Sequence, residues 1–237
     1  MKPIRRAQPW LGTIVEVSAV AGPELANSAI DAAFSAVARV HNGMSPQIAE
    51  SDVGRFNAGS TGAYLIDAWT AEVLTAAHEL AEVSDGAFDI TLGTGGLSAW
   101  SLRDRQLIKH RQNIQLDLGG IAKGYAVDRA VEVLQDAGIA CGWVNAGGDL
   151  RVFGDLDFPL HIRSPQAPER TLPLLALRDG AFATSVFDHR AAHTHISVAA
   201  PLCLWADALT KIMAFAPAHC EPLLARYHAQ TWRHPPF

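Results

Sequence analysis

The sequence predicts an α+β fold with helices packed on an antiparallel sheet, and three observations support this prediction. Residues 13–20 alternate apolar and polar side chains as a half-buried strand does. The first half of the chain then carries apolar residues at helical spacing, and the second half carries several short candidate strands in succession. Strands that follow one another without intervening helices favour an antiparallel sheet over a doubly wound parallel one. With 237 residues, of which 49% are hydrophobic, the chain is expected to form a single domain over residues 1–237.

The first half is expected to contain one strand and two helices. After the strand, Gly22-Pro23 opens a helix, because proline at the first helical position loses no hydrogen bond. Asn42-Gly43 is expected to end this helix. A second helix is predicted over residues 67–84 with Asp67 as its N-cap, and residues 44–64 are predicted to be a long ordered loop. The apolar stripe predicted for the first helix consists of Leu25, Ala29, Ala33, Val37 and Val40.

The second half is expected to alternate less regularly between strands and helices. A strand over residues 114–118 leads into a helix over residues 121–137 that ends at Gly138. The further predicted strands cover residues 142–145, 150–153, 160–163, 172–177, 181–185 and 194–199, and the last two predicted helices cover residues 206–215 and 218–229.

Charge and cysteine content exclude several classes of protein. The 19 Lys and Arg residues against 24 Asp and Glu residues leave a net charge of -5 without a basic run, so a nucleic-acid groove is not expected. The three cysteines are far apart and form no C-x-x-C pair, which indicates a reducing compartment and no cysteine-based zinc site. Residues 1–12 lack the apolar region of an export signal and no membrane segment is found, so a cytoplasmic location is expected.

The segment from residue 116 to residue 128, L-D-L-G-G-I-A-K-G-Y-A-V-D, is a candidate phosphate site. Gly119 and Gly120 permit a tight turn after Asp117, and the following helix directs its positive end at that turn. Lys123 adds a positive charge in the first helical turn, so a phosphate or pyrophosphate is the expected ligand. An ordinary strand-to-helix turn with a solvated lysine is the alternative. The pattern matches neither G-x-x-x-x-G-K-[ST] nor G-x-G-x-x-G.

Three other groups of residues are candidates with simpler alternatives. Asp207, Thr210 and Lys211 share one helical face, where a carboxylate with a hydroxyl can bind Mg²⁺; a helix cap with an i,i+4 ion pair is the favoured alternative. Residues 145–149, N-A-G-G-D, read best as a hairpin turn. His189, His193 and His195 are candidates for a transition-metal site, a general base or surface histidines.

Taken in order, these segments resemble the ApbE family of FAD:protein FMN transferases. Seven motifs match over residues 11–211, which is nearly the whole chain. They are Leu11-Gly12-Thr13 for the family's M-G-T, residues 51–57 for S-E/D-x-x-R-x-N, residues 86–91 for G-A-F-D-x-T, residues 117–128 for D-L-G-G-I-A-K-G-Y-A-V-D, residues 144–149 for V-N-A-G-G-D, residues 183–185 for A-T-S-G and residues 206–211 for A-D-A-L-x-T.

The resemblance implies an ApbE-type fold with a T-fold-like core and an enzyme that binds FAD with Mg²⁺. Such an enzyme transfers FMN to a Ser or Thr hydroxyl of a target flavoprotein and releases AMP. By position, Asp117, Lys123 and the Gly119-Gly120 turn would contact FAD, and the Gly120 carbonyl and the Asp207 carboxylate would bind the metal. The resemblance also places Leu11, Trp100 and Thr184 along the cofactor.

Two departures from the family pattern affect the expected chemistry. The D-P-x-T-G part of the family's histidine segment is absent, which leaves His195 as the candidate base. Lys211 stands where the family has a metal-binding Thr, and Thr210 lies one place early. The alternatives to the transferase are therefore an FAD pyrophosphatase, in which water replaces the protein hydroxyl, and a flavin-binding protein without catalysis.

Overall fold

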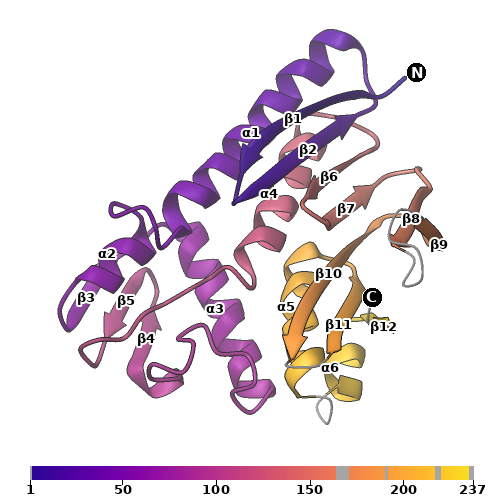
Figure 1. Cartoon of the computed structure of the whole chain (residues 1–237). Coiled ribbons are helices and arrows are strands. Elements are labelled where there is room, and N and C mark those ends of the chain that lie inside the picture. The colour runs from indigo at the N-terminus through magenta and orange to yellow at the C-terminus, as the bar shows by residue number, and fades with distance from the viewer. Residues whose placement is uncertain (1, 164–170, 190–191, 217–219, 235–237) are drawn as a thin grey trace.

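A seven-stranded antiparallel sheet forms the centre of the computed structural model, which describes residues 2–163, 171–189, 192–216 and 220–234 (Figure 1). Every neighbouring pair in this sheet is antiparallel, which confirms the predicted α+β class. In spatial order the strands are β1 (Ile4–Trp10), β2 (Thr13–Ala19), β6 (Gly142–Ala146), β7 (Asp149–Phe153), β10 (Gly180–His189), β11 (Ala192–Ala200) and β12 (Gln230–His234).

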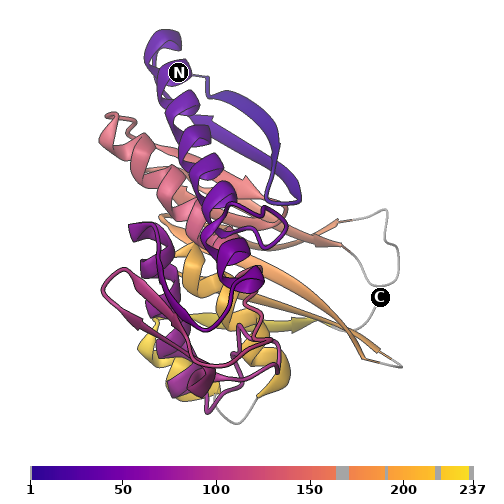
Figure 2. The same ribbon diagram turned by 90° about the vertical axis from the view of Figure 1, so that its left-hand side faces the viewer.

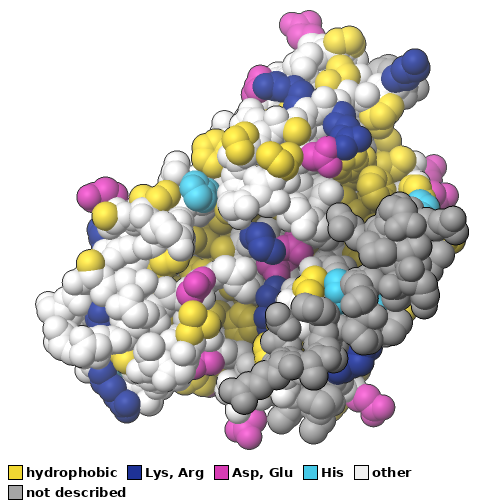
Figure 3. Space-filling view, viewed as in Figure 1, with side chains coloured by type: hydrophobic (Ala, Val, Ile, Leu, Met, Phe, Trp, Pro, Cys, Tyr) yellow, Lys and Arg dark blue, Asp and Glu magenta, His cyan; other side chains and the backbone are white. Residues whose placement is uncertain are grey.

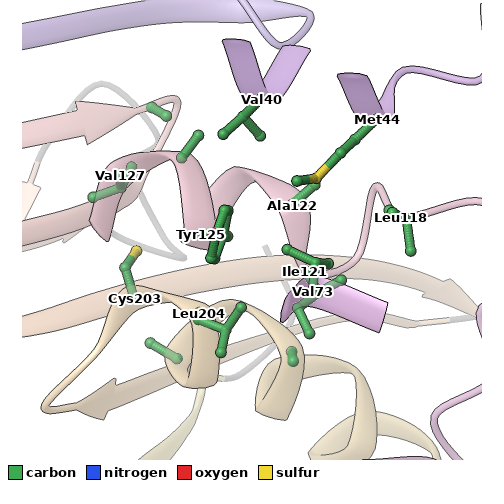
Figure 4. Close-up of a cluster of buried hydrophobic side chains, with 14 of the residues drawn as sticks. Val40, Met44, Val73, Leu118, Ile121, Ala122, Tyr125, Val127, Cys203 and Leu204 are labelled. Atoms are coloured by element: carbon green, nitrogen blue, oxygen red, sulfur yellow. The ribbon is translucent and has the colours of Figure 1, made fainter. Parts of the chain in front are cut away.

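Helices cover one face of this sheet and a hairpin covers the other (Figure 2). The central helix is α4 (Ala122–Asp136), which packs between α1 (Pro23–Met44) and α5 (Cys203–Phe215). Figure 4 shows the contact: Val40 and Met44 of α1 reach α4 from one side, and Cys203 and Leu204 of α5 from the other. The hairpin of β8 (Phe158–Arg163) and β9 (Thr171–Leu177) covers the opposite face through a second apolar cluster.

Most of the remaining elements lie beyond the C-terminal end of α1, whereas α6 (Cys220–Arg226) lies beside α5 (Figure 1). A small antiparallel sheet joins β3 (Gly62–Leu65), β5 (Gln106–Lys109) and β4 (Trp100–Arg103). The other helices are α2 (Asp52–Ala58), α3 (Ala68–Val83) and the short 3-10 helix η1 (Leu97–Ala99). Among the described residues, no helix combines the length and the apolar character needed to cross a bilayer.

Most predicted elements form, with ends that differ by a few residues. In β2 the side chains of Val15, Val17 and Ala19 are fully buried, as the alternation predicts. The first helix continues past Asn42-Gly43 to Met44, because its last turn packs on the rest of the core. Leu25 was expected in the core and is instead 45% exposed, since the buried stripe begins one residue later at Ala26.

Two predictions about the middle of the chain are wrong. Residues 114–118 form no strand, because a side chain and a loop take their hydrogen bonds. Asn57 donates to the carbonyl of Leu116 at 2.9 Å and accepts its N–H at 2.7 Å, and the N–H of Asp117 donates to the carbonyl of Ile90 at 2.8 Å. Residues 44–64, predicted as a loop, contain α2 and β3. Ser51 caps α2 by accepting the N–H of Gly54 at 2.8 Å, a local signal that the loop composition obscured.

Helix α5 begins at Cys203, three residues before the predicted start, because a carboxylate from α4 caps it. Asp128 accepts the N–H of Cys203 at 2.9 Å and the N–H of Leu204 at 2.8 Å, and it pairs with Arg151 at 3.0 Å. Negative charge at a helix N-terminus is stabilising. This earlier start places Asp207 in the second turn of α5, so Asp207 is not a helix cap.

Lys109 is a buried lysine that closes the C-terminal end of α2. Its Nζ donates to the carbonyls of Phe56 (2.9 Å), Asn57 (3.2 Å) and Gly59 (3.0 Å), and only 2% of the residue is exposed. Burial lowers the pKa of this ammonium.

Lys109→Met leaves these carbonyls without their donor, and we expect it to lower the unfolding free energy by about 2–4 kcal/mol. Urea unfolding measures this loss, and the exposed Lys2→Met serves as the control; equal midpoints for both variants would contradict the assignment.

Candidate active site

The turn that precedes α4 is held by its own aspartate. Asp117 accepts the N–H of Gly119 at 2.7 Å, and the N–H of Ile121 donates to the carbonyl of Leu118 at 3.0 Å. Helix α4 begins directly afterwards at Ala122, so the positive end of its dipole lies at this turn. The turn is therefore suited to an anionic ligand.

Helices α4 and α5 meet at a glycine beside this turn. A Cβ on Gly124 would lie 2.6 Å from the carbonyl carbon of Cys203 and 2.9 Å from the Cβ of Asp207. The N–H of Gly124 donates to Oδ2 of Asp207 at 3.1 Å. The absence of a side chain at Gly124 thus lets the buried Asp207 carboxylate reach the first turn of α4, which brings together segments 83 residues apart in the sequence.

Four charged side chains form a cluster at this contact, which we call the charged cluster: Lys123, Asp149, Asp207 and Lys211. Lys123 forms an ion pair with Asp149, and its Nζ lies 3.9 Å from Oδ1 of Asp207. Lys211 forms an ion pair with the same Oδ1 and donates to the backbone carbonyl of Asp207 at 2.9 Å. Both carboxylates are buried, whereas both lysines remain partly exposed. Figure 3 shows basic and acidic side chains side by side near the middle of this face.

Two cavities flank the turn and share Asp117 and Gly119 in their walls. One, of about 400 Å³, lies between the β1–β2 turn, the end of α1 and Lys123, with His41 and Met44 in its wall. The other, of about 370 Å³, is lined by Phe88, Gly120, Lys211 and Phe215, among others. Each cavity therefore combines apolar surface with one ammonium group of the charged cluster.

Leu11 borders the first cavity in a strained conformation. It occupies the two-residue turn between β1 and β2 with a φ of 56°, followed by Gly12 at 72°. A leucine in the left-handed region is uncommon, and such strain tends to occur at functional sites. Leu11 and Gly12 of this turn both line the cavity.

The charges of the cluster influence one another's protonation. Burial lowers the pKa of Lys123, but the neighbouring Asp207 and Asp149 carboxylates raise it more, so that the net shift is upward. Burial raises the pKa of Asp149 to about 6, the Asp207 carboxylate adds to this rise, and Lys123 opposes it. Lys123 therefore stays charged throughout the neutral range.

Comparison with known protein families identifies the family of this chain. The profile of the ApbE family matches residues 11–101 and 95–195, which include the turn, Lys123 and Asp149. The chain belongs to the ApbE family.

Named relatives and solved ApbE structures agree with this assignment. The chain is 24% identical over 216 residues to the FAD:protein FMN transferase of Vibrio cholerae serotype O1, covering 75% of this chain and 64% of that protein. It is 29% identical over 178 residues to the FAD:protein FMN transferase of Rhodobacter capsulatus, covering 61% of this chain and 34% of that protein. The aligned region thus spans less than two thirds of the length of either relative.

The ApbE fold is reproduced closely despite low sequence identity. The flavin transferase ApbE from Vibrio cholerae superposes with a TM-score of 0.85 at 20% identity, over 98% of this chain and 93% of that one. The apo form of the Pseudomonas stutzeri flavinyl transferase ApbE gives 0.84 at 21% identity, over 100% and 92% of the two chains. The ApbE protein of Thermotoga maritima gives 0.78 at 21% identity, over 99% and 97%.

Most of the residues that the ApbE resemblance implied lie together. The structure brings the turn, the charged cluster and Leu11 to the two adjoining cavities. The residues concerned are Leu11, Asp117, Gly119, Gly120, Lys123, Asp207 and Lys211.

Three residues expected in the ApbE site lie elsewhere. In β11, Ile196 and Val198 are buried on the helix-covered face, so strand alternation places His195 on the opposite face of the sheet, away from Asp207. Thr184 also lies on that opposite face, where its hydroxyl is 2.7 Å from the hydroxyl of Ser197. Trp100 is buried against the ring of His78 on α3 and lines neither cavity. The side chains of His189 and His193 lie outside the described residues.

The described residues do not fit the magnesium site that the ApbE resemblance implies. Oδ1 of Asp207 is occupied by Lys211 and Oδ2 by the N–H of Gly124. The hydroxyl of Thr210 donates to the carbonyl of Asp207 at 2.7 Å and lies 2.7 Å from the hydroxyl of Ser185. A protonated lysine has no lone pair for a metal, so Lys211 is not a ligand here. Within the described part of the chain, no group of three His, Cys, Asp or Glu side chains is arranged to hold a metal ion.

The sequence interpretation missed Asp149 and Asp128. Residues 145–149 do form the β6–β7 hairpin turn, with positive φ at Gly147 and Gly148, as predicted. Asp149, which closes this turn, is also the first residue of β7 and pairs with Lys123. The sequence did contain a signal for both residues, because Asp128 and Asp149 each stand in an ApbE motif. Neither an exposed helix face nor a solvated turn requires a carboxylate at these positions.

The raised pKa of Asp149 predicts a specific effect of pH on stability. Because the folded-state pKa, about 6, exceeds the unfolded value of about 3.9, the folded protein binds the proton more tightly. The stability gained from this protonation is complete below about pH 4 and is lost as the pH rises through about 6, by about 3 kcal/mol. Asp149→Asn should flatten this part of the pH profile in thermal unfolding. Asp85→Asn, at an exposed position, is the control, and unaltered profiles in both variants would refute the prediction.

Proposed function

We propose that this protein transfers FMN from FAD to a Ser or Thr hydroxyl of a target flavoprotein and releases AMP. The observation that carries the proposal is the position of the D-L-G-G turn: it lies between two cavities, each with one ammonium group in its wall. FAD has the same order of parts, because its pyrophosphate lies between a flavin half and an adenine half. Membership of the ApbE family, and the names of the two curated relatives, support this activity.

In this proposal the chain binds the pyrophosphate at the turn and directs positive charge toward it. The N-terminal end of α4, Lys123 and Lys211 face the phosphate oxygens, where negative charge grows during the reaction. The acceptor hydroxyl oxygen forms a bond to the phosphorus of the FMN half and releases its proton to solvent water. The bond from that phosphorus to the bridging oxygen breaks, and AMP leaves.

The magnesium ion implied by the family resemblance is not used in this proposal, because Lys211 occupies the carboxylate that would bind it. A divalent metal would supply Lewis acidity at the same phosphates. Here the residues that face the cavities supply positive charge of their own.

The decisive test is incubation of the protein with FAD and a threonine-bearing acceptor peptide, followed by measurement of AMP and of the peptide mass. We expect AMP release together with a peptide that gains the mass of an FMN group. AMP without a labelled peptide would identify an FAD pyrophosphatase instead, and FAD binding without either product would identify a flavin-binding protein without catalysis.

His195→Ala tests the role that the sequence suggested for this histidine. Because His195 lies on the far face of the sheet, we expect the rate of transfer to stay within about threefold of the unchanged protein. Loss of a general base typically costs about 10²–10⁴-fold, so the assay separates the two cases clearly. A loss of that size, in a variant with an unaltered circular dichroism spectrum, would assign His195 to the reaction.

A further inference from the structure

The charged cluster is electrically neutral without any added ion. It consists of two carboxylates, Asp149 and Asp207, and two ammonium groups, Lys123 and Lys211. A further buried carboxylate, Asp128, is matched by Arg151 and by two helix N–H groups. A divalent cation at Asp207 would have to displace Lys211 or add two positive charges to a balanced site, and both are costly in a buried place.

The carboxylates lie behind the lysines as seen from the cavities. Asp207 and Asp149 are 0% and 1% exposed, whereas the Lys211 side chain is 22% exposed and lines the cavity that contains Gly120 and Phe88. Because the two ammonium groups of the cluster line the cavities and its two carboxylates do not, the cluster presents its positive side to a ligand at the turn.

Lys211 is held in place by the protein and still has a donor available. Its Nζ donates to the backbone carbonyl of Asp207 at 2.9 Å and to Oδ1 of the same residue. An ammonium group has three N–H donors, so within the described part of the chain one is left for a ligand. The lysine chain also lies against the turn, since its Cε is 3.7 Å from the place that a Cβ on Gly120 would occupy.

We propose that the Lys211 ammonium is a built-in replacement for a divalent cation, so that this protein binds the pyrophosphate of FAD without metal. The inference rests on the proposed function, because FAD supplies the pyrophosphate. It makes Lys211 a phosphate-contacting residue and Asp207 the residue that positions it. The site then depends on one covalently attached charge instead of a diffusible ion.

Titration of FAD in EDTA and in excess Mg²⁺, with protein fluorescence as the readout, tests this inference. For the unchanged protein we expect the two dissociation constants to agree within about threefold. Lys211→Met, which keeps the length and removes the charge, should weaken FAD binding in EDTA by about tenfold or more. Lys211→Arg should stay within about threefold, and Lys2→Met is the matched control for loss of a lysine elsewhere.

A second variant tests the exclusion of metal directly, with Mn²⁺ alone as the probe. Lys211→Thr frees the Asp207 carboxylate and places a hydroxyl one turn from it, a combination that suits a hard cation. We expect electron paramagnetic resonance to detect one bound Mn²⁺ in Lys211→Thr and none in the unchanged protein. FAD binding by Lys211→Thr should then become dependent on Mg²⁺.

The outcomes separate failure of this inference from failure of the proposed function. FAD binding by the unchanged protein only in Mg²⁺ would overturn the inference and leave the transferase proposal standing. Wild-type affinity in Lys211→Met, or stoichiometric Mn²⁺ binding by the unchanged protein, would overturn it as well. Absence of FAD binding in both EDTA and Mg²⁺ would refute the proposed function itself, and the inference with it.

Discussion

Asp207→Ala is expected to lower the rate of FMN transfer by at least about a hundredfold. Asp207 is fully buried and holds three groups at once: the ammonium of Lys211, the ammonium of Lys123 and the N–H of Gly124. Without it, the positive charges lose their fixed direction toward the turn. FAD binding should weaken much less than transfer, because the lysines remain, and this split distinguishes mispositioning from loss of the binding site.

The same substitution should also reduce stability, by about 2–4 kcal/mol, because it leaves Lys211 without its buried partner and Lys123 with Asp149 alone. Stopped assays of AMP and labelled peptide, combined with FAD titration, measure the effect on function, and thermal unfolding measures the effect on stability. Asp136→Ala, at the exposed far end of α4, is the control. Full transfer by Asp207→Ala would remove Asp207 from the mechanism.

Gly124→Ala is expected to destabilise the protein by about 3 kcal/mol, which for a chain of this size corresponds to a decrease in Tm of about 10 °C. The added Cβ would lie 2.6 Å from the carbonyl carbon of Cys203, which is backbone, so α4 and α5 must move apart. That movement also lengthens the hydrogen bond from Gly124 to Asp207. Transfer should therefore fall even where the variant is still folded.

Gly43→Ala is the matched control for this prediction. Gly43 lies in the last turn of α1, and a Cβ there meets only the hydroxyl of Thr70, at 3.6 Å. The alanine should be neutral or stabilising by about 0.5–1 kcal/mol, as expected for a glycine replaced within a helix. If the two alanine variants melted at the same temperature, the close approach of α4 and α5 would not be the constraint that the distances indicate.

The local signals in the sequence predicted the turn before α4 correctly, but they did not predict the structure of residues 114–118 that precede it. Two glycines followed by a helical pattern identified the start of α4, because turn and helix preferences act over neighbouring residues. Residues 114–118 have the composition of a strand, yet the side chain of Asn57 takes their hydrogen bonds. Competition of that kind arises between segments 59 residues apart, so no local pattern reports it.

The site shows the same division at the level of single side chains. Lys123 was identifiable from its place in the first helical turn, whereas its partner Asp149 resembled an ordinary turn residue. His195 was the candidate base because of its chemistry, but the register of β11 places it on the other face of the sheet. Register depends on the pairing of β10, β11 and β12, which is a property of the assembled sheet.

Local patterns in the sequence were enough to predict the α+β class, the positions of most helices and strands, and the glycine turn before α4, because each depends on residues close together in the chain. The i,i+4 ion pair of Asp207 and Lys211 was also predictable from the sequence, but only the tertiary structure shows that this pair lies beside that turn and that Thr184 and His195 do not. Both outcomes depend on how closely α4 and α5 approach at Gly124 and on which face of the sheet they cover. Those are packing relations between distant segments, and they are settled only when the core forms.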